Sequence, residues 1–226
     1  IAGIDGNGQS ELVEAITGLR RVEKGKITLK NKDITNKSPK YIRKVGLSHV
    51  PEDRNTRGLN RQLNIADNLA LVDIANNKYS KFTILDREEI DKNAGKLIEN
   101  FDIRPNDHRA LTSSLSGGNA QKVVVAREVS LSKDFMIVSQ PTRGVDIGAI
   151  ETIHNTLRRQ KENGVGILLI SAELEEILSL SDRILVMHEG EITGELLAHE
   201  ANENNLGLMM MGSSKQDITD KQTEAK

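Results

Sequence analysis

The 226-residue sequence contains no cysteine, which excludes both a disulfide framework and a thiolate metal site. It also lacks long hydrophobic runs. The longest ones span residues 123–126, 166–170 and 184–187, far below the roughly 18 residues that a membrane-spanning helix requires. We therefore expect any association with a membrane to depend on a partner.

The sequence has no large excess of either charge. Its 31 Lys and Arg residues nearly balance its 33 Asp and Glu residues, and the basic residues are scattered. Nucleic acid is therefore disfavoured as a partner, because a basic patch is its usual electrostatic footprint. The five histidines lack metal-ligand spacing, and we expect them to be structural or exposed. A hydrophobic content of 37% allows a sizeable core. The length fits one large domain or one domain with a subdomain, and we expect the second.

The first turn of the chain, residues 3–10, reads Gly-Ile-Asp-Gly-Asn-Gly-Gln-Ser. This is the spacing of a phosphate-binding loop, except that Gln9 stands where lysine belongs. The glycines allow close approach of the backbone to a phosphate, and residues 10–18 predict a helix whose first amides would face the anion. A neutral amide, however, supplies a dipole in place of a positive charge. By itself the turn is equally compatible with an ordinary strand-to-helix connection.

Hydrophobic periodicity divides the rest of the chain. Between residues 64 and 131 strand signals are absent and helical patterns dominate, which predicts an inserted helical subdomain. Residues 135–138, 149–162 and 166–171 then predict a βαβ unit and hence a parallel sheet. The remaining predicted elements are strands at 26–29 and 45–50, a short helix within 35–43, helices at 65–74, 86–101 (capped by Asp86) and 120–129, and a hairpin of 183–187 with 191–196 around a turn at 188–190.

Three further segments carry expectations. The polar stretch 52–63 is typical of a solvated loop, with a contact surface as the alternative. Residues 206–211 are expected to pack as the end of a helix. Residues 213–226 form a polar tail that we expect to be disordered. Because the chain starts inside the glycine-rich motif, we also expect it to be a fragment of a longer polypeptide.

The most specific motif is Leu115-Ser116-Gly117-Gly118-Asn119, directly before a predicted helix. Alone, Ser116 could be a helix N-cap and the glycines a loop. Downstream, however, the strand at 135–138 leads into residues 139–146, Ser-Gln-Pro-Thr-Arg-Gly-Val-Asp. Together with the phosphate loop, this ordered set resembles the nucleotide-binding domain of ABC transporters, and the likeness covers residues 1–212.

The resemblance implies an α/β fold: a P-loop NTPase (RecA-like) core with a mostly parallel sheet, an inserted α-helical signature subdomain and an edge β-hairpin. Within the family, the chain looks most like the C-terminal half of the double ATPase subunits that energise bacterial uptake of simple sugars and nucleosides. Residues 50–54, 115–119 and 140–144 carry that likeness. Gln140 before Pro141 favours the nucleoside branch.

Several positions depart from the family pattern. Gln9 replaces the phosphate-binding lysine, Ser139 the aspartate that holds Mg²⁺, and Gln140 the glutamate that activates water. Ala172 stands for the switch histidine, and Glu52 for a glutamine. An amide cannot act as a general base at neutral pH, so this half's own site is expected to be inactive.

The residues that match the pattern keep the roles that the resemblance implies. The signature loop would bind ATP held by the opposing half, and Asp146 would be an N-cap, an interdomain contact or both. Ser10 is the family's Mg²⁺ ligand, expected to be weak here. The signature loop comprises Leu115, Ser116, Gly117, Gly118 and Asn119. The weak nucleotide cradle comprises Gly3, Asp5, Gly6, Asn7, Gly8, Gln9 and Ser10.

ATP and Mg²⁺ are thus expected mainly in the partner half's site. The implied partners are the N-terminal nucleotide-binding half of the same polypeptide, the transmembrane permease subunits and, indirectly, an extracellular solute-binding protein. This places the protein peripherally on the cytoplasmic face of the cell membrane. Two alternatives stay open: a self-sufficient ATPase in which Glu173 or Glu52 has taken over the acid/base role, and an interface module that binds no nucleotide.

Overall fold

The computed structural model describes residues 1–81, 84–132 and 134–215, which form two compact units. Unit 1 comprises residues 1–49, 134–140 and 166–215. Unit 2 comprises residues 50–133, apart from the undescribed positions, and 141–165. Most of the tail predicted as disordered, from residue 216 on, lies outside the described residues.

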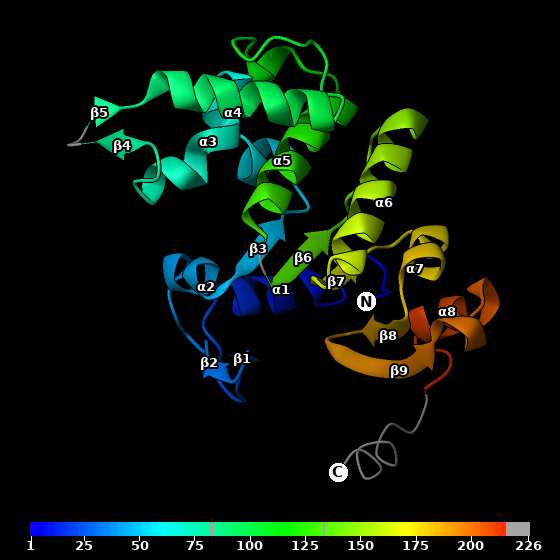
Figure 1. Ribbon diagram of the computed structural model, residues 1–226. Coiled ribbons are helices and arrows are strands. Elements are labelled where there is room, and N and C mark those ends of the chain that lie inside the picture. Colours follow the sequence, from blue (N-terminus) through cyan, green and yellow to red (C-terminus); the bar gives the residue numbers. More distant parts are fainter. Residues whose placement is uncertain (82–83, 133, 216–226) are drawn as a thin grey trace. The chain divides into compact units, whose positions relative to one another are not determined.

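A parallel sheet forms the centre of unit 1 (Figure 1). Its strands are β3 (Leu47–Val50), β6 (Phe135–Ser139) and β7 (Gly166–Ile170), in the order β3-β6-β7. The pairing of β6 with β7 is parallel, which confirms the predicted parallel sheet. Ala2 bridges both Ser171 and Val186 in parallel, so the start of the chain extends this sheet toward the next strand. The phosphate loop therefore begins in the core of unit 1.

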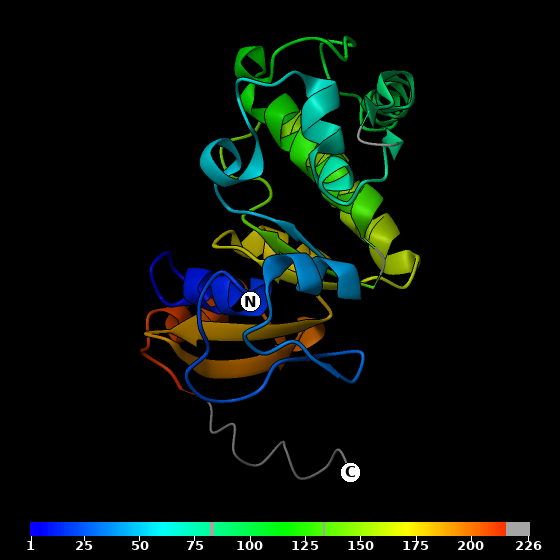
Figure 2. The ribbon, with the colours of Figure 1, turned by 90° about the vertical axis from the view of Figure 1, so that its left-hand side faces the viewer.

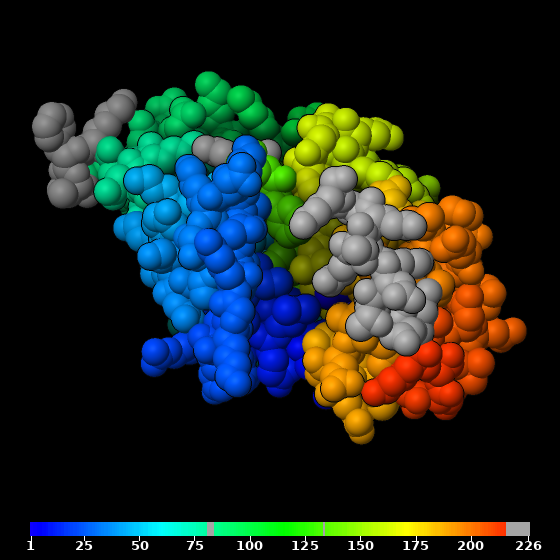
Figure 3. Space-filling view, turned by 90° about the horizontal axis from the view of Figure 1, so that it is seen from below, coloured from blue at the N-terminus to red at the C-terminus, as the bar shows by residue number. Residues whose placement is uncertain are grey.

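The predicted hairpin is also present in unit 1, formed by β8 (Arg183–His188) and β9 (Glu191–Leu197) in antiparallel pairing. His188 belongs to β8, so the turn is shorter than predicted. Helix α8 (Glu203–Met210) packs on the hairpin, and its Leu206, Met209 and Met210 are buried, as expected for residues 206–211. Figure 3 shows the surface of β9 and α8 in orange to red.

The N-terminal part of unit 1 contains α1 (Gln9–Thr17), the two-residue strands β1 (Thr28–Leu29) and β2 (Lys32–Asp33), and α2 (Pro39–Val45). The start of helix α1, which Figure 2 draws above the β8–β9 hairpin, adjoins the hairpin turn, because Gly190 N donates to the Asn7 carbonyl oxygen at 2.9 Å. Helix α1 contributes to one hydrophobic cluster, whose buried members are Ile1, Val13, Ile34, Ile42, Leu47, Ile137, Ile170 and Met187. Helix α7 (Leu174–Leu180), which the sequence did not predict, also belongs to this unit.

Unit 2 is mainly helical. Its elements are a π-helix (Arg54–Gly58), α3 (Ile65–Ala75), β4 (Ser80–Lys81), β5 (Ile84–Leu85), α4 (Arg87–Asn100), a 3-10 turn (Thr112–Ser114), α5 (Gly117–Leu131) and α6 (Ile147–Glu162). Helix α3 packs against α4 and α5, and α5 packs against α6. Asp86 caps α4 by accepting a hydrogen bond from Glu89 N at 3.1 Å, as predicted.

Asn68 forms a buried polar junction in unit 2. It is fully buried, and its Nδ2 donates to the carbonyl oxygens of Asn60 (2.9 Å) and Asn64 (3.0 Å) and to Thr112 Oγ1 (3.3 Å). Its Oδ1 accepts from Asn60 N at 2.8 Å. The junction therefore ties the loop before α3 to the 3-10 turn that precedes residue 115.

Three predictions of local structure were wrong or incomplete. The stretch 64–131 does contain strands, because β4 and β5 form a hairpin, but two-residue strands are too short to produce an alternating pattern. The strand predicted at 45–50 begins at Leu47, since α2 continues to Val45 and Gly46 ends it in the left-handed region at φ 116°. The segment 52–63 is largely exposed, as predicted for a solvated loop, but it contains the π-helix, which buries Gly58.

None of the helices in the described parts of the chain has the length and apolar character needed to cross a membrane.

Candidate functional site

The phosphate loop in unit 1 has the backbone shape of an anion cradle. Gly6 and Gly8 adopt left-handed φ angles of 89° and 99°, which glycine reaches without steric cost. Gly8 is the N-cap residue of α1. Because glycine has no side chain, no hydrogen bond from the N-cap side chain occupies the first backbone amides of this helix. Such a helix start suits a phosphate group.

Gln9, however, turns back into its own loop. Its side chain is buried, and Nε2 donates to the carbonyl oxygen of Ile4 at 3.1 Å. The same oxygen accepts from Asn7 N at 3.3 Å and Asn7 Nδ2 at 3.2 Å. A Cβ at Gly3 would overlap the Gln9 amide and would lie 2.8 Å from the Met187 backbone carbonyl oxygen, so this position favours glycine. The amide at the position where the sequence pattern predicts a lysine is therefore directed at the protein itself.

Gln140 connects three predicted positions of the same site. It adopts a left-handed φ of 47°, and its Nε2 donates to Asp5 Oδ1 at 3.2 Å while its Oε1 accepts from Ala172 N at 3.3 Å. The structure thus brings the phosphate loop, the end of β6 and the loop after β7 together within unit 1. Ser139 is buried beside Gln140, and its Oγ has no hydrogen-bond partner in the described residues.

The donor set of this site does not fit Mg²⁺. The hydroxyls of Ser10 and Ser139 and the amide of Gln9 are neutral, and the Asp5 carboxylate is engaged by Gln140. Mg²⁺ is usually held by one or two carboxylates. No group of three or more His, Asp or Glu side chains with metal-binding geometry occurs among the described residues. The weak Mg²⁺ role of Ser10 has no support in this arrangement.

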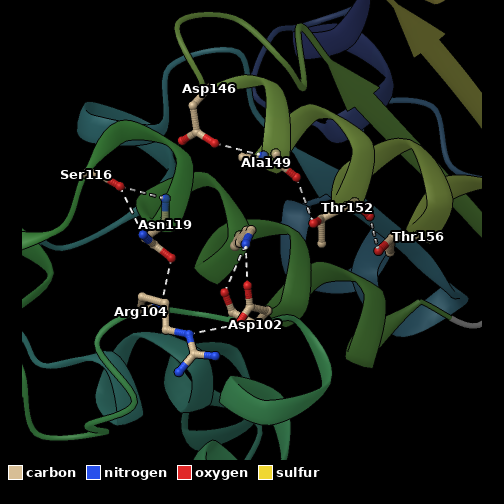
Figure 4. Close-up of polar contacts among 10 residues, drawn as sticks. Asp102, Arg104, Ser116, Asn119, Asp146, Ala149, Thr152 and Thr156 are labelled. Atoms are coloured by element: carbon tan, nitrogen blue, oxygen red, sulfur yellow. Dashed lines mark hydrogen bonds and ion pairs between the residues drawn. The ribbon is translucent and has the colours of Figure 1, made fainter.

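The signature loop in unit 2 opens helix α5 (Figure 4). Ser116 is the N-cap, with its Oγ accepting from Asn119 N at 3.3 Å and from Asn119 Nδ2 at 3.0 Å. The backbone N–H of Arg104 donates to Asn119 Oδ1 at 2.7 Å. The reading of Ser116 as an N-cap is confirmed, and the loop is linked to a turn 15 residues away in sequence.

That turn is held by charged groups. Lys122 of α5, largely buried, donates from Nζ to the Asp102 carbonyl oxygen at 2.9 Å and approaches Asp102 Oδ2 at 3.4 Å. Arg104 Nε donates to Asp102 Oδ1 at 2.8 Å. The hydrogen bond from Arg104 and the positive charges of Lys122 and Arg104 lower the pKa of Asp102. The carboxylate therefore stays charged and fixes the turn.

The two signature glycines allow tight packing. A Cβ at Gly117 would collide with the Arg54 guanidinium and the Gly144 carbonyl oxygen, and one at Gly118 with the Asp146 carboxylate. Asp146 Oδ1 accepts from Ala149 N at 3.0 Å and caps α6, which confirms the N-cap reading. The signature loop and the Asp146 loop therefore meet within unit 2.

Sequence reasoning missed the arginines of this cluster. Arg54 donates from Nη1 to the Arg143 carbonyl oxygen at 2.7 Å and from Nη2 to the Gly144 carbonyl oxygen at 3.1 Å. Arg143 in turn donates from Nη1 to Glu52 Oε1 at 2.6 Å. The only sequence signal for the Arg143–Glu52 pair is the opposite charge of the two side chains. Because 91 residues separate them, the sequence does not indicate that they meet.

Comparison with known proteins gives consistent matches. A family model described as "ABC transporter" matches residues 1–143. The chain is 48% identical over 214 residues to the "Nucleoside import ATP-binding protein NupA" of Lactococcus lactis subsp. cremoris, covering 95% of this chain and 42% of that protein. It is 45% identical over 217 residues to the "Guanosine import ATP-binding protein NupO" of Bacillus subtilis, covering 96% and 42%. The chain thus spans about two fifths of the length of these curated relatives.

Solved structures share the fold. A structure of MJ1267, an ATP-binding cassette of an ABC transporter, matches with a TM-score of 0.76 and 26% identity, covering 93% of this chain and 85% of that one. The dimeric bacterial ABC transporter cassette MJ0796 matches with a TM-score of 0.74 and 22% identity, covering 87% and 83%. The expected P-loop NTPase fold, α/β with a parallel sheet, is confirmed.

Proposed function

Because the chain belongs to the ABC transporter family, we propose that it is the C-terminal nucleotide-binding half of a tandem ATPase subunit that energises import of nucleosides or simple sugars. Two observations support this. Relatives named for nucleoside, guanosine and ribose import match over more than nine tenths of the chain, and the chain spans 42%, 42% and 41% of their lengths. The two relatives of highest identity among these three carry nucleoside or guanosine in their names, which favours the nucleoside branch.

The observation that carries the proposal is the contrast between the two motifs. In the phosphate loop, Gln9 is bonded to Ile4 and Gln140 to Asp5, so the groups at the catalytic positions are neutral amides satisfied by the protein. The signature loop, in contrast, carries the sequence Leu-Ser-Gly-Gly-Asn, on which the family resemblance rests, at the start of a 15-residue helix. The domain therefore serves ATP through its signature loop, and its own phosphate loop is catalytically inactive.

The signature loop has the chemistry to bind phosphate. The Ser116 hydroxyl and the amides of Gly117 and Gly118 lie at the N-terminus of α5, where the helix dipole favours negative charge. Donors fixed in place before the reaction cost no reorganisation when charge develops on the phosphoryl group. Their role is to bind and orient the γ-phosphate of ATP held by the N-terminal half, while that half supplies the Mg²⁺ ligands and the water-activating base.

The loss of catalysis at the domain's own site follows from how much each missing catalytic group normally contributes to the rate of hydrolysis. Removal of one general base costs about 10²–10⁴-fold in rate. Here the base position is Gln140, the lysine position is Gln9 and the Mg²⁺ position is Ser139. Simultaneous losses of this kind leave no measurable turnover at that site. Asp5 does not substitute, because its carboxylate is held by Gln140.

Membrane partners complete the proposal. By resemblance to the family, the segment 52–63 would contact the permease subunits. Closure and release of the two nucleotide-binding halves would then transmit motion to the permease subunits. The Asn68 junction supports this route, since it joins Asn60 to the turn at Thr112 directly before the signature loop. The subunit would lie on the cytoplasmic face of the membrane and serve an extracellular solute-binding protein indirectly.

A self-sufficient ATPase is the competing function. Glu52 is a poor candidate base because Arg143 holds its carboxylate at 2.6 Å. Glu173 is exposed and directly follows Ala172, whose N–H is bonded to Gln140, so it is the carboxylate to test. The third possibility, an interface module that binds no nucleotide, predicts that the signature loop has no influence on ATP hydrolysis.

The deciding experiment measures Mg-ATP hydrolysis by the full-length subunit with and without Ser116→Arg. The bulky cation fills the space before α5, so we expect activity to collapse, while Ser213→Arg, an exposed matched control, leaves it unchanged. Activity that persists in Ser116→Arg would support the interface module. Glu173→Gln tests the remaining alternative, the self-sufficient ATPase. If this domain hydrolyses ATP by itself, some turnover persists when the catalytic residues of the N-terminal half are removed, and Glu173→Gln abolishes that turnover.

A further inference from the structure

The hydroxyl of Ser116 has no free acceptor position. A serine hydroxyl carries one proton and two acceptor lone pairs. Both lone pairs are used, because Oγ accepts from Asn119 N at 3.3 Å and from Asn119 Nδ2 at 3.0 Å. The remaining hydrogen-bonding capacity of this side chain is to donate its proton.

The direction of the Asn119 amide is fixed by the turn beside it (Figure 4). The Arg104 N–H donates to Asn119 Oδ1 at 2.7 Å, so the oxygen end of the amide faces the turn and the nitrogen end faces Ser116. Asp102 holds that turn through Arg104 and Lys122. A flipped amide would place two donors against each other at Arg104, which is repulsive, so the bond from Arg104 N selects the orientation in which Nδ2 faces Ser116.

We propose that Asn119 is a positioning residue that turns the Ser116 proton out of the signature loop, toward a ligand that can only accept. A phosphate oxygen of ATP is such a ligand, because it is unprotonated and anionic at neutral pH. This inference rests on the proposed function, since the phosphate is the one held by the N-terminal half. The inference adds a role for Asn119: by setting the direction of the Ser116 hydroxyl proton, Asn119 makes the signature loop selective for an anion that only accepts hydrogen bonds.

The isosteric change Asn119→Asp tests the direction of the proton. The carboxylate still accepts from Arg104 N, but its second oxygen now faces Ser116 as an acceptor. The Ser116 hydroxyl then donates inward and is lost to the phosphate. Asn119→Ala removes the Nδ2 donor without adding an acceptor, so the hydroxyl rotates freely and the loss should be smaller.

The experiment measures kcat and KM for ATP in the full-length subunit. We expect Ser116→Ala and Asn119→Asp each to lower kcat by on the order of 10²-fold, the size of the loss of one donor to developing negative charge. In the Ser116→Ala background, Asn119→Asp should cost no more than about twofold, because no proton remains to redirect. Asn155→Asp, which adds the same charge to an exposed position of α6 in unit 2, is the control and should not change kcat.

The outcomes separate the alternatives. If Asn119→Asp costs the same in both backgrounds, it acts through its charge alone and the inference is overturned. The inference also fails if Asn119→Asp leaves kcat unchanged while Ser116→Ala lowers it. If Ser116→Ala itself has no effect, the proposed function fails. Should Asn119→Asp not fold, as judged from its thermal unfolding, Asn119→Ala gives the same test through a several-fold loss that disappears in the Ser116→Ala background.

Discussion

The Gln140 side-chain amide donates a hydrogen bond to the Asp5 carboxylate over 3.2 Å, although 135 residues separate the two in sequence. This contact joins the phosphate loop to the end of β6. In the family pattern the position of Gln140 carries the base that activates water, whereas here it holds a cross-link. The Gln140 side chain therefore helps to keep the phosphate loop in place, whatever its part in catalysis.

The glycines of the signature loop give a direct steric prediction. Gly118→Ala would place a Cβ against the Asp146 carboxylate and the Ala149 methyl group, so we expect a destabilisation of about 1–3 kcal/mol by overpacking. Urea unfolding measures it. Gly95→Ala is the matched control, because Gly95 lies inside α4 with open space around it. That change should stabilise by up to about 1 kcal/mol through helix propensity.

One result would contradict the prediction for Gly118→Ala. Equal unfolding midpoints for Gly118→Ala and the unmodified protein would mean that Asp146 moves away without cost. The contact between the starts of α5 and α6 would then not be tight enough to position the signature loop.

The Asn68 junction predicts a large effect of a small change. Asn68→Ala removes the acceptor of the Asn60 N–H and one of the donors to the Asn60 carbonyl oxygen, which keeps its bonds from Leu63 N (3.1 Å) and Thr112 Oγ1 (3.0 Å). Loss of the partner of one N–H group costs about 1–3 kcal/mol, so a loss of this size is expected in the free energy of unfolding. Asn155→Ala, at an exposed position on α6, should stay within about 0.5 kcal/mol. A loss below 1 kcal/mol for Asn68→Ala would show that water replaces the missing amide.

The sequence allowed prediction where local chemistry decides the structure. The βαβ pattern, the hairpin and the caps Asp86 and Asp146 follow from periodicity and from oxygen side chains before helices, and the structure confirms them. The order of the motifs identified the family. These features depend on residues within a few positions of one another.

The contacts that define the candidate site depend on tertiary packing. Nothing in the sequence indicates that Gln9 bonds to Ile4, because a loop glutamine can equally point to solvent. The bond from Arg104 N to Asn119 and the link of Arg54 to Arg143 join segments that approach only after folding. Backbone groups are partners in all three cases, and since every residue has them, they leave no trace in the sequence.

Asp53 provides a pH-dependent prediction. Its carboxylate accepts from Thr56 Oγ1 at 2.7 Å and from Thr56 N and Asn55 N, which lowers its pKa from the ordinary 3.8. A carboxylate with a lowered pKa in the folded state stabilises the fold above its unfolded pKa, and this contribution is lost as pH falls through the folded pKa. Because Asp53 is exposed, the effect should be small.

The measurement compares urea unfolding of the unmodified protein and Asp53→Asn from pH 7 down to pH 3. Asparagine still caps the π-helix but does not titrate. The difference in stability should be constant above about pH 5 and should shrink below about pH 4, where Asp53 of the unfolded chain begins to protonate while the carboxylate of the folded chain is still charged. A difference that does not change with pH would assign the stabilisation to the neutral hydrogen bonds alone.

Restoring the lysine alone should not revive the phosphate loop. Gln9→Lys returns the positive charge but leaves Gln140 in place of the base and Ser139 in place of the Mg²⁺ ligand. In a full-length subunit whose N-terminal half lacks its own phosphate-loop lysine, we expect no ATPase activity, and Gln9→Lys should not recover it. The buried Gln9 amide also bonds to Ile4, so the exchange should lower the melting temperature as well. Turnover that reappears with Gln9→Lys would mean that a base other than residue 140 operates in this half, and Glu173→Gln in that background would then identify it.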